Sequence, residues 1–534
     1  MKITQTYTTL AALAAMAAGI TSAYADTLKV NHNPTVISES LDLTDASIYE
    51  SAPSEIKSTD DIEFTHSTTI WGQLVSKISK DFTINKLTYN SKITGNIWNE
   101  KLLSIDKGVT ANVNSLNINM DSDDDIAGNT CSYLVLNDAS VLNIANGITY
   151  TDNRQKLGWG SISLSFQGNE KGKLSVGGDI DFINKTNLKD NQIDRYLGFD
   201  NIGDVSVGGV IKMSSAINNK IALTGDWTNK TFKRSLGGIE IGSRGFIQLK
   251  SRYVSNIDLE FTNSSKNEFV GTLITRQKAN VTCDTDGNKT INTPGEVTDN
   301  KLNITMNATD AKNGNQILRF GEYNNFWMDA DGVDKGQTKD IYGTTQANNS
   351  IATVTVVSGR LDLGMASTMR GEKLVLASSS SAGNAVFSAT GTTAGSEIGK
   401  VTFGEFQGSN GTIAFDFAKD SNDFIAIEGA ATAADLTFFI NMTKSEFDSY
   451  LSESATELNY DIMSFQSEDS SFNTPTLAFA DSQLTGSLAF NADDSTGITT
   501  VKLTITTAAV PEPATVAAIL GIAALAFAAY RRRK

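Results

Sequence analysis

Three stretches in the first half of the chain repeat one pattern of hydrophobic and small residues. SVLNIANGITY begins at Ser140, GKLSVGGDIDF at Gly172 and GDVSVGGVIKM at Gly203, so the offsets are 32 and 31 residues. In each stretch apolar side chains alternate with polar ones, small residues follow, and the alternation resumes. The equivalent apolar positions are Leu142, Leu174 and Val205, then Ile144, Val176 and Val207, then Ile148, Ile180 and Ile211. A period of two indicates strands with one buried face, and the small residues indicate a corner between two short strands.

Similar alternating segments continue downstream, where RGFIQLK begins at Arg244, SGRLDLG at Ser358 and GTIAFDF at Gly411. The chain has 6 prolines, and only Pro294 lies between Pro53 and Pro475. Because a proline removes one hydrogen bond from a strand ladder, this scarcity is expected where nearly every segment is a paired strand.

The pattern predicts an all-β protein, and two architectures fit it. One is a right-handed parallel β-helix, a solenoid in which stacked coils bury an inward file of Leu, Ile and Val. The alternative is a series of tandem β-sandwich domains. We expect a leader and N-terminal cap over residues 26–100 and the solenoid body over 101–508. The capping-box spacing of Thr443 and Glu446 predicts a helical insertion near 443–458.

The first 25 residues have the order of features that defines a secretory signal peptide. Lys2 gives a positive start, an apolar stretch follows, and Ala23 and Ala25 form an A-x-A cleavage site before Asp26. We therefore expect signal peptidase to remove this segment during export.

The C-terminal residues have three parts. Pro511, Glu512 and Pro513 precede an uncharged apolar stretch, 514–530, which predicts a short transmembrane helix. The basic end that follows is expected to stay cytoplasmic, which leaves the body on the other side of the membrane. It consists of Arg531, Arg532, Arg533 and Lys534.

This tail, from residue 510 to 534, resembles the PEP-CTERM sorting signal of Gram-negative bacteria. The resemblance implies an exosortase-type processing enzyme as partner. It also implies transient anchoring in the inner membrane, followed by transfer to the cell surface or extracellular matrix. An ordinary C-terminal anchor is the alternative, and both interpretations export the body.

Three segments of the body are similar to repeats of autotransporter passengers, which are β-helices and often act as adhesins. They are NEFVGTLIT from Asn267, ATVTVVSGRLDLG from Ala352 and GTIAFDFAKDSNDFIAI from Gly411. The stretch from Asn459 to Thr506 is similar to the last coils that precede the tail in such proteins. The resemblance implies an autotransporter-like β-helix body with an adhesive or structural role.

The charge of the body narrows the range of partners. Residues 1–25 hold one basic residue and 514–534 hold four, with no acid in either, so a processed body keeps 39 of 44 basic residues against 60 acids. A net charge near −21 argues against nucleic acid as a partner. Extracellular polysaccharide and other surface proteins remain the expected partners.

The sequence indicates no catalytic site. His32 and His66 are the only histidines, neither has metalloprotease spacing, and a Ser-His-Asp triad would have to use His66. The alternative function is a β-helix that binds or degrades polysaccharide, with paired carboxylates in a groove lined by tryptophans. The five tryptophans are Trp71, Trp98, Trp159, Trp227 and Trp327.

No cofactor is predicted. The chain has two D-x-D-G segments, one with Asp284 and Asp286 and one with Asp329 and Asp331. We expect both to be ordinary Asp-Gly turns, and the alternative is that their side chains bind calcium. The two cysteines, Cys131 and Cys283, are far apart in sequence, and two separate thiols are favoured over a disulfide. The sequence therefore predicts an exported, surface-attached or matrix-bound structural or adhesin-like protein.

Overall fold

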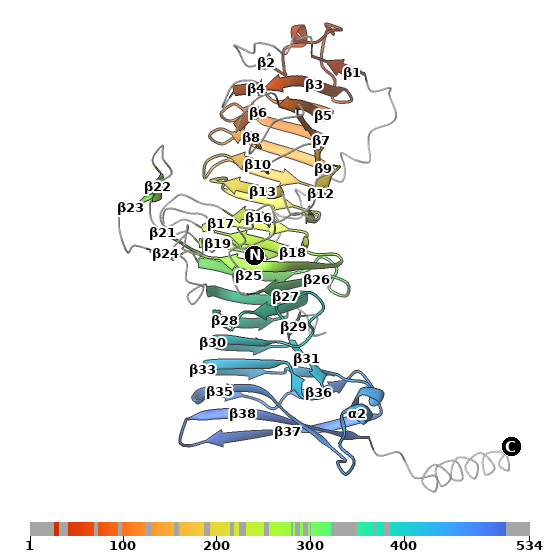
Figure 1. Cartoon of the computed structure of the whole chain (residues 1–534), viewed down its shortest axis with the longest axis vertical. Helices are drawn as coiled ribbons and strands as arrows, with labels where there is room; N and C mark the ends of the chain where they lie inside the picture. Colours follow the sequence, from red (N-terminus) through yellow and green to blue (C-terminus); the bar gives the residue numbers. More distant parts are fainter. Residues whose placement is uncertain are drawn as a thin grey trace, which may run out of the picture.

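The structure of the chain is a computed structural model. It describes residues 26–30, 41–68, 73–93, 99–122, 130–153, 160–185, 193–213, 218–223, 231–249, 256–278, 281–283, 289–291, 297–299, 301–321, 350–367, 369–378 and 385–508. The described strands stack along one long axis, with the first coils at one end and the last strands at the other (Figure 1). The all-β prediction is confirmed, and 34 of the described strands belong to one continuous set of hydrogen-bonded ladders.

Parallel strands one coil apart pair with each other in a first ladder that runs the length of the stack. Its strands are β1 (Thr27–Lys29), β3 (Asp61–Thr68), β5 (Phe82–Ile93), β7 (Thr110–Ser122), β9 (Val141–Asp152), β11 (Lys173–Val176) with β12 (Asp179–Asn184), β14 (Asp204–Val207) with β15 (Ile211–Met213), β17 (Thr231–Leu236), β19 (Asn256–Phe261), β25 (Lys301–Asn307), β27 (Ser350–Met365), β28 (Arg370–Ala377), β30 (Lys400–Ser409), β33 (Phe424–Ala434) and β35 (Leu458–Phe472).

A second parallel ladder forms another face of the same coils. Its strands are β2 (Leu41–Asp42), β4 (Gln73–Ile78), β6 (Asn99–Ile105), β8 (Thr130–Leu136), β10 (Gly160–Gln167), β13 (Ile193–Asp200), β16 (Asn218–Leu223), β18 (Ile239–Gln248), β20 (Lys266–Ile274), β26 (Asn315–Phe320), β27, β29 (Ala385–Ala389), β31 (Thr412–Ala418), β34 (Thr437–Asn441) and β36 (Thr476–Phe479). β18 and β27 turn the corner and pair in both ladders.

The repeat read from the sequence sets the register of the coils. Leu142 pairs with Leu174, and Leu174 pairs with Val205, so the predicted equivalent positions are direct neighbours in the first ladder. These side chains point inward and are 2% exposed or less. Burying an aliphatic side chain of this size stabilises the fold by about 1.5–3 kcal/mol, and the stack repeats this gain in each coil.

Glycines occupy the corner that the small residues predicted, because successive coils approach too closely there for a side chain. A Cβ on Gly178 would lie 1.8 Å from the Asn146 carbonyl oxygen, and one on Gly237 would lie 2.3 Å from the Gly208 oxygen. The Gly208 N–H also donates to the Val176 oxygen at 2.7 Å. The backbone therefore packs against backbone at this corner.

Amide side chains form hydrogen-bonded rows along the outer face of the first ladder. Asn143 Nδ2 donates to Asn112 Oδ1 at 2.9 Å, and Asn119 Nδ2 donates to Asn90 Oδ1 at 2.8 Å. Asn90 Nδ2 in turn donates to Glu63 at 2.8 Å. These rows link the outward positions of successive coils in the same way that the ladder links their backbones.

Coil length varies because loops project from the stack. Thr412 and its partner Thr437 are 25 residues apart, whereas Asn256 and its partner Lys301 are 45 apart. The longer interval includes two antiparallel pairs that lie beside the stack: β21 (Arg276–Lys278) with β24 (Val297–Asp299), and β22 (Val281–Cys283) with β23 (Lys289–Ile291).

The predicted helical insertion is present but shorter than expected. α2 (Lys444–Tyr450) begins with a complete capping box between Thr443 and Glu446, and Phe447 on it is fully buried. The helix ends at Tyr450, and an extended Leu451 follows. One short 3₁₀ turn, η1 (Ala46–Ile48), lies near the first coils, and the two-residue β32 (Ser421–Asn422) pairs antiparallel with β31.

The final strands differ from the sequence expectation of further coils. β37 (Leu484–Asp493) and β38 (Ile498–Thr507) form an antiparallel hairpin, and β38 also pairs antiparallel with β35. The turn between them is tight: Asp493 accepts from the Ser495 N–H at 2.9 Å, and Gly497 has a φ of +68°. A connection this short can join only antiparallel strands, since parallel ones need a crossover.

The stack also begins earlier than the expected boundary at residue 101. β3, β4, β5 and β6 already pair in register within the two ladders, so residues 61–105 form ordinary coils. β1 adds to the first ladder beside β3.

Candidate functional site

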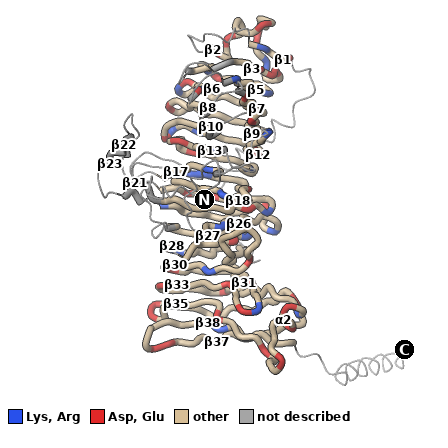
Figure 2. The backbone as a smooth tube through the Cα atoms, viewed as in Figure 1, with Lys and Arg blue, Asp and Glu red and all other residues tan. Residues whose placement is uncertain are grey.

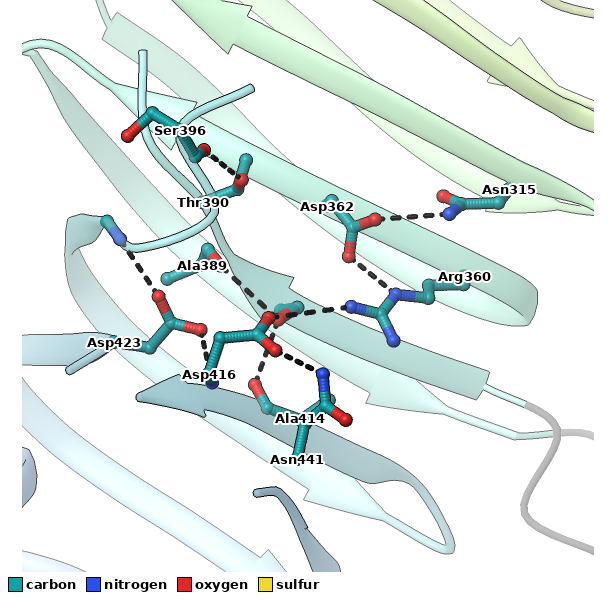
Figure 3. A network of polar contacts seen from close by, with 12 residues as sticks. Asn315, Arg360, Asp362, Ala389, Thr390, Ser396, Ala414, Asp416, Asp423 and Asn441 are labelled. Atoms are coloured by element: carbon teal, nitrogen blue, oxygen red, sulfur yellow. Dashed lines mark hydrogen bonds and ion pairs between the residues drawn. The ribbon is translucent and has the colours of Figure 1, made fainter. Parts of the chain in front are cut away.

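Four titratable side chains gather beside strands β27 and β31 of the second ladder, and we call them the Arg360 network. Arg360 and Asp362 lie on β27, Asp416 lies on β31, and Asp423 lies just before β33 (Figure 3). They are close because β27 pairs with β29 and β29 pairs with β31. Stacking thus joins residues that are distant in the sequence.

The carboxylates of Asp362 and Asp416 share one guanidinium. Arg360 Nε donates to Asp362 Oδ1 at 2.7 Å, and Arg360 also lies 3.9 Å from Asp416 Oδ2. Asp362 Oδ2 accepts from Asn315 Nδ2 at 3.1 Å, and Asp416 Oδ1 accepts from the Asn441 amide. The Asp362 and Asp416 side chains are only 9% and 13% exposed.

Asp423 has no solvent exposure and binds backbone groups from two segments. Its Oδ1 accepts from the Gly399 N–H at 2.9 Å, and its Oδ2 accepts from the Asp416 N–H at 2.8 Å. The Asp423 N–H donates to the Asp416 oxygen at 2.9 Å. Asp423 thereby joins β31 to the segment that precedes β30.

That segment, residues 390–399, connects β29 to β30, and we call it the covering segment. Arg319 Nη1 donates to Thr390 Oγ1 at 2.8 Å and to the oxygens of Gly391, at 2.9 Å, and Ser396. Arg319 Nε donates to Glu268 at 2.6 Å. With Arg319 fastening one end and Asp423 the other, the covering segment is held to the coils at both ends.

Burial dominates the electrostatics of these acids. It raises the pKa of Asp423 to about 8. The hydrogen bonds from the two backbone N–H groups act to lower this pKa, whereas the nearby Asp416 and Asp362 act to raise it. Burial also raises the pKa of Asp416, although the Asn441 amide and Arg360 act in the opposite direction. Asp423 is therefore mostly neutral at pH 7.

A neutral carboxyl beside a carboxylate is an arrangement that enzymes use for acid–base chemistry. Here, however, the oxygens of Asp362, Asp416 and Asp423 are each engaged by a side chain or a backbone N–H. Of these three acids, Asp423 contacts the covering segment, through the Gly399 N–H.

The raised pKa of Asp423 predicts a pH dependence of stability. Between its unfolded pKa near 4 and its folded pKa of about 8, the folded chain holds a proton that the unfolded chain has lost, so stability falls as pH rises. An Asp423→Asn variant lacks this titration. We expect the melting temperature of the wild type, relative to that of the variant, to decrease steadily from pH 5 to pH 8.

Asp310→Asn is the matched control. The Asn313 side chain and backbone N–H groups hold the pKa of this half-buried acid below its usual value, so it contributes no change above pH 5. A constant difference between wild type and Asp423→Asn across the same range would show that Asp423 is ionised in the folded protein.

His66 is buried among polar side chains but does not form a catalytic triad. Its Nε2 lies 3.2 Å from Glu100, while Ser91 and Ser132 donate to Glu100 at 2.9 and 3.1 Å. Both serines thus bond to the acid and not to the imidazole. His66 Nδ1 has no hydrogen-bond partner among the described residues, so no serine there is activated by a base.

Most of the other residues singled out in the sequence lie outside the described residues. These are Ala23, Ala25, His32, the five tryptophans, Asp284, Asp286, Asp329, Asp331, Pro511, Glu512, Pro513 and the four basic residues of the C-terminus. Asp26 is the first described residue. Cys131 is a half-buried thiol on β8, whereas the side chain of Cys283 is not described. Within the described part of the chain, no cluster of acids, histidines and cysteines has the geometry of a metal site.

Sequence reasoning missed the Arg360 network. Its residues follow no motif, and 360 and 423 are joined only through the stacking of intervening coils. The one available signal is the pair of outward charges at Arg360 and Asp362 in a strand whose other outward residues are small or uncharged.

The last described residues lead directly to the tail. β38 ends at Thr507, and the Ala508 N–H donates to the Gln483 oxygen at 2.7 Å, three residues before Pro511. The chain is thus an all-β stack of coils whose final strand passes straight into a segment with the composition of a sorting signal.

A family model of the PEP-CTERM protein-sorting motif matches residues 509–534. The chain carries this motif, which marks an exported protein that an exosortase processes and that is sorted to the cell surface. The chain matches no curated protein and no solved structure. Among the helices of the described ranges, none is long and apolar enough to cross a membrane, and the expected span, 514–530, falls outside those ranges.

Proposed function

We propose that the body is a right-handed parallel β-helix that acts as a non-catalytic structural or adhesive element at the cell surface or in the extracellular matrix. Right-handed connections between parallel strands are the strong preference of L-amino-acid chains. The signal peptide and signal peptidase would start its export, and exosortase processing at the tail would complete its delivery.

The observation that carries this proposal is the unbroken parallel pairing from β1 to β36. In such a stack each coil contacts only its neighbours, so the product is an elongated element with long outer faces. The engagement of the described carboxylates in the Arg360 network supports a role without catalysis.

The test compares cells that make the whole protein with cells in which residues 61–505 are replaced by an unrelated exported domain. We expect the replacement to reach the surface but to reduce surface adhesion or matrix cohesion. Unchanged adhesion and cohesion would contradict the proposal.

A second measurement distinguishes the structural or adhesive function from the alternative, polysaccharide degradation. The processed protein is incubated with a panel of polysaccharides, and reducing ends and unsaturated products are counted. We expect none above the level of a buffer control. Release of product by the wild type, and its loss in both Asp362→Asn and Asp416→Asn, would instead favour polysaccharide degradation at the Arg360 network.

A further inference from the structure

Charged side chains of alternating sign form a straight column on the outer face of the first ladder. Lys173 on β11 pairs in register with Asp204 on β14, Asp204 with Lys233 on β17, and Lys233 with Asp258 on β19. Their strand neighbours Leu174, Val205 and so on point inward, so the four charges point outward. Lys173, Asp204 and Lys233 are exposed, and Asp258 is half-buried. We call these four residues the alternating column.

The residues of the alternating column form few polar contacts with other described residues, although Asp204 interacts electrostatically with the buried guanidinium of Arg234. No described residue forms an ion pair of 4.0 Å or less with Lys173, Asp204 or Lys233, and Asp258 accepts only an amide hydrogen bond, from Asn303 at 2.8 Å. By contrast, Lys212 on the adjoining strand is paired with Asp179 at 2.6 Å. The column therefore presents charges that a partner surface can neutralise.

We propose that this face binds a second copy of the chain, with the two stacks side by side and running in opposite directions. A two-fold axis parallel to the strands, placed between β14 and β17, reverses the order of the column. Lys173 then faces Asp258 of the second copy, and Asp204 faces its Lys233. Every position meets the opposite charge, because both copies have the same coil spacing of about 4.8 Å.

The same face excludes the parallel arrangement. If the two stacks run in the same direction through this column, each residue meets its own copy, so Lys233 faces Lys233 and Asp204 faces Asp204. Like charges at an interface oppose association and select against that geometry. The alternation of positive and negative charges along the column therefore favours a second copy that runs in the opposite direction.

The neighbouring positions permit close approach. In the next outward column Ser175, Ser206 and Ser235 are small, uncharged and in register, and Glu260 follows them in the coil of Asp258. Around the glycine corner, Lys212 is already paired with Asp179 at 2.6 Å and lies in register with Glu240 of its own chain. The charge complementarity between copies is therefore carried by the alternating column.

Because the body has an overall negative charge, we expect the proposed association to depend on the salt concentration. The alternating column has no net charge, whereas the rest of the body is strongly acidic (Figure 2). At about 0.15 M salt the Debye length is about 8 Å, so repulsion between distant acids is screened while direct contacts persist. We therefore expect association at physiological salt and weaker association when the salt is lowered.

Two charge reversals test the proposal in trans. Asp204→Lys and Lys233→Asp each place like charges opposite each other twice in a symmetric dimer, so each variant alone should associate at least about tenfold more weakly than the wild type. A mixture of the two variants restores opposite charges at both contacts and should form heterodimers. The full-length chain, with a different tag on each variant, is purified in mild detergent, and mass is measured by sedimentation and by co-purification of the tags.

Association in the mixture would show that the two residues lie at a contact between copies. A substitution that only damaged folding would not be rescued by a second chain. Lys101→Asp, an exposed lysine on the second ladder, is the matched control and should associate like the wild type. The double variant Asp204→Lys with Lys233→Asp should also self-associate. A monomeric wild type at physiological salt, equal association of all variants, or failure of the mixture to pair would each overturn the proposal.

Discussion

Replacing Pro511, Glu512 and Pro513 with alanine should abolish most of the transfer of the protein to the cell surface. The sequence predicts that two prolines on either side of a glutamate keep this segment extended and rigid for recognition by a processing enzyme. Alanines would let the helix predicted for 514–530 continue through these positions. The matched motif begins at residue 509, directly after Ala508, the last described residue. Cell fractionation and mass spectrometry of the C-terminal peptide measure the result.

Pro475→Ala is the control, since it removes a proline from the body and leaves the tail intact. We expect it to be processed like the wild type. If the alanine variant reached the surface in full, or if wild-type surface material retained the C-terminal Arg and Lys residues, processing at this motif would be refuted.

Gly178→Ala should be among the most destabilising single substitutions in the body. The added methyl group would lie 1.8 Å from the Asn146 carbonyl oxygen, which is backbone and is fixed by the ladder. Separating the two coils would weaken the pairing of β9 with β11 and β12, at a cost of about 3 kcal/mol. Hydrogen exchange followed by mass spectrometry should show faster exchange in β9, β11 and β14 than elsewhere.

Gly242→Ala makes the same chemical change where space is available, because no atom lies within 4 Å of its added Cβ. We expect a change in unfolding free energy within about 0.5 kcal/mol. Equal exchange in the Gly178→Ala and Gly242→Ala variants would contradict the tight corner described above.

The sequence was most informative where one coil repeats the next. Leu142, Leu174 and Val205 were identified as equivalent positions, and they are neighbours in the ladder because an inward file must be apolar in every coil. The glycine corner and the capping box at Thr443 were also predicted, since close backbone approach and an unpaired helix start each require particular residue types.

Features that depend on loops or on distant coils could not be predicted in this way. Loop length is not constrained by packing, so the 45-residue interval between β19 and β25 has no periodic signal. Asp423 acquires its properties from Gly399 and the covering segment, which no pattern connects to it. The four charged residues of the alternating column can be read from the sequence, but their alternation of sign becomes apparent only when the strands are aligned in register.

The direction of the hydrogen bonds has a mechanical consequence. In both ladders the bonds between coils run along the stack, so a pull between its two ends loads them in tension, one coil after another, and not in shear. Such a body should yield stepwise from a loaded end, releasing one coil's length of chain at each step. A pull on the C-terminal end acts first on β38, which pairs antiparallel with β35 and β37, and we expect the rupture of this sheet to set the first threshold of force.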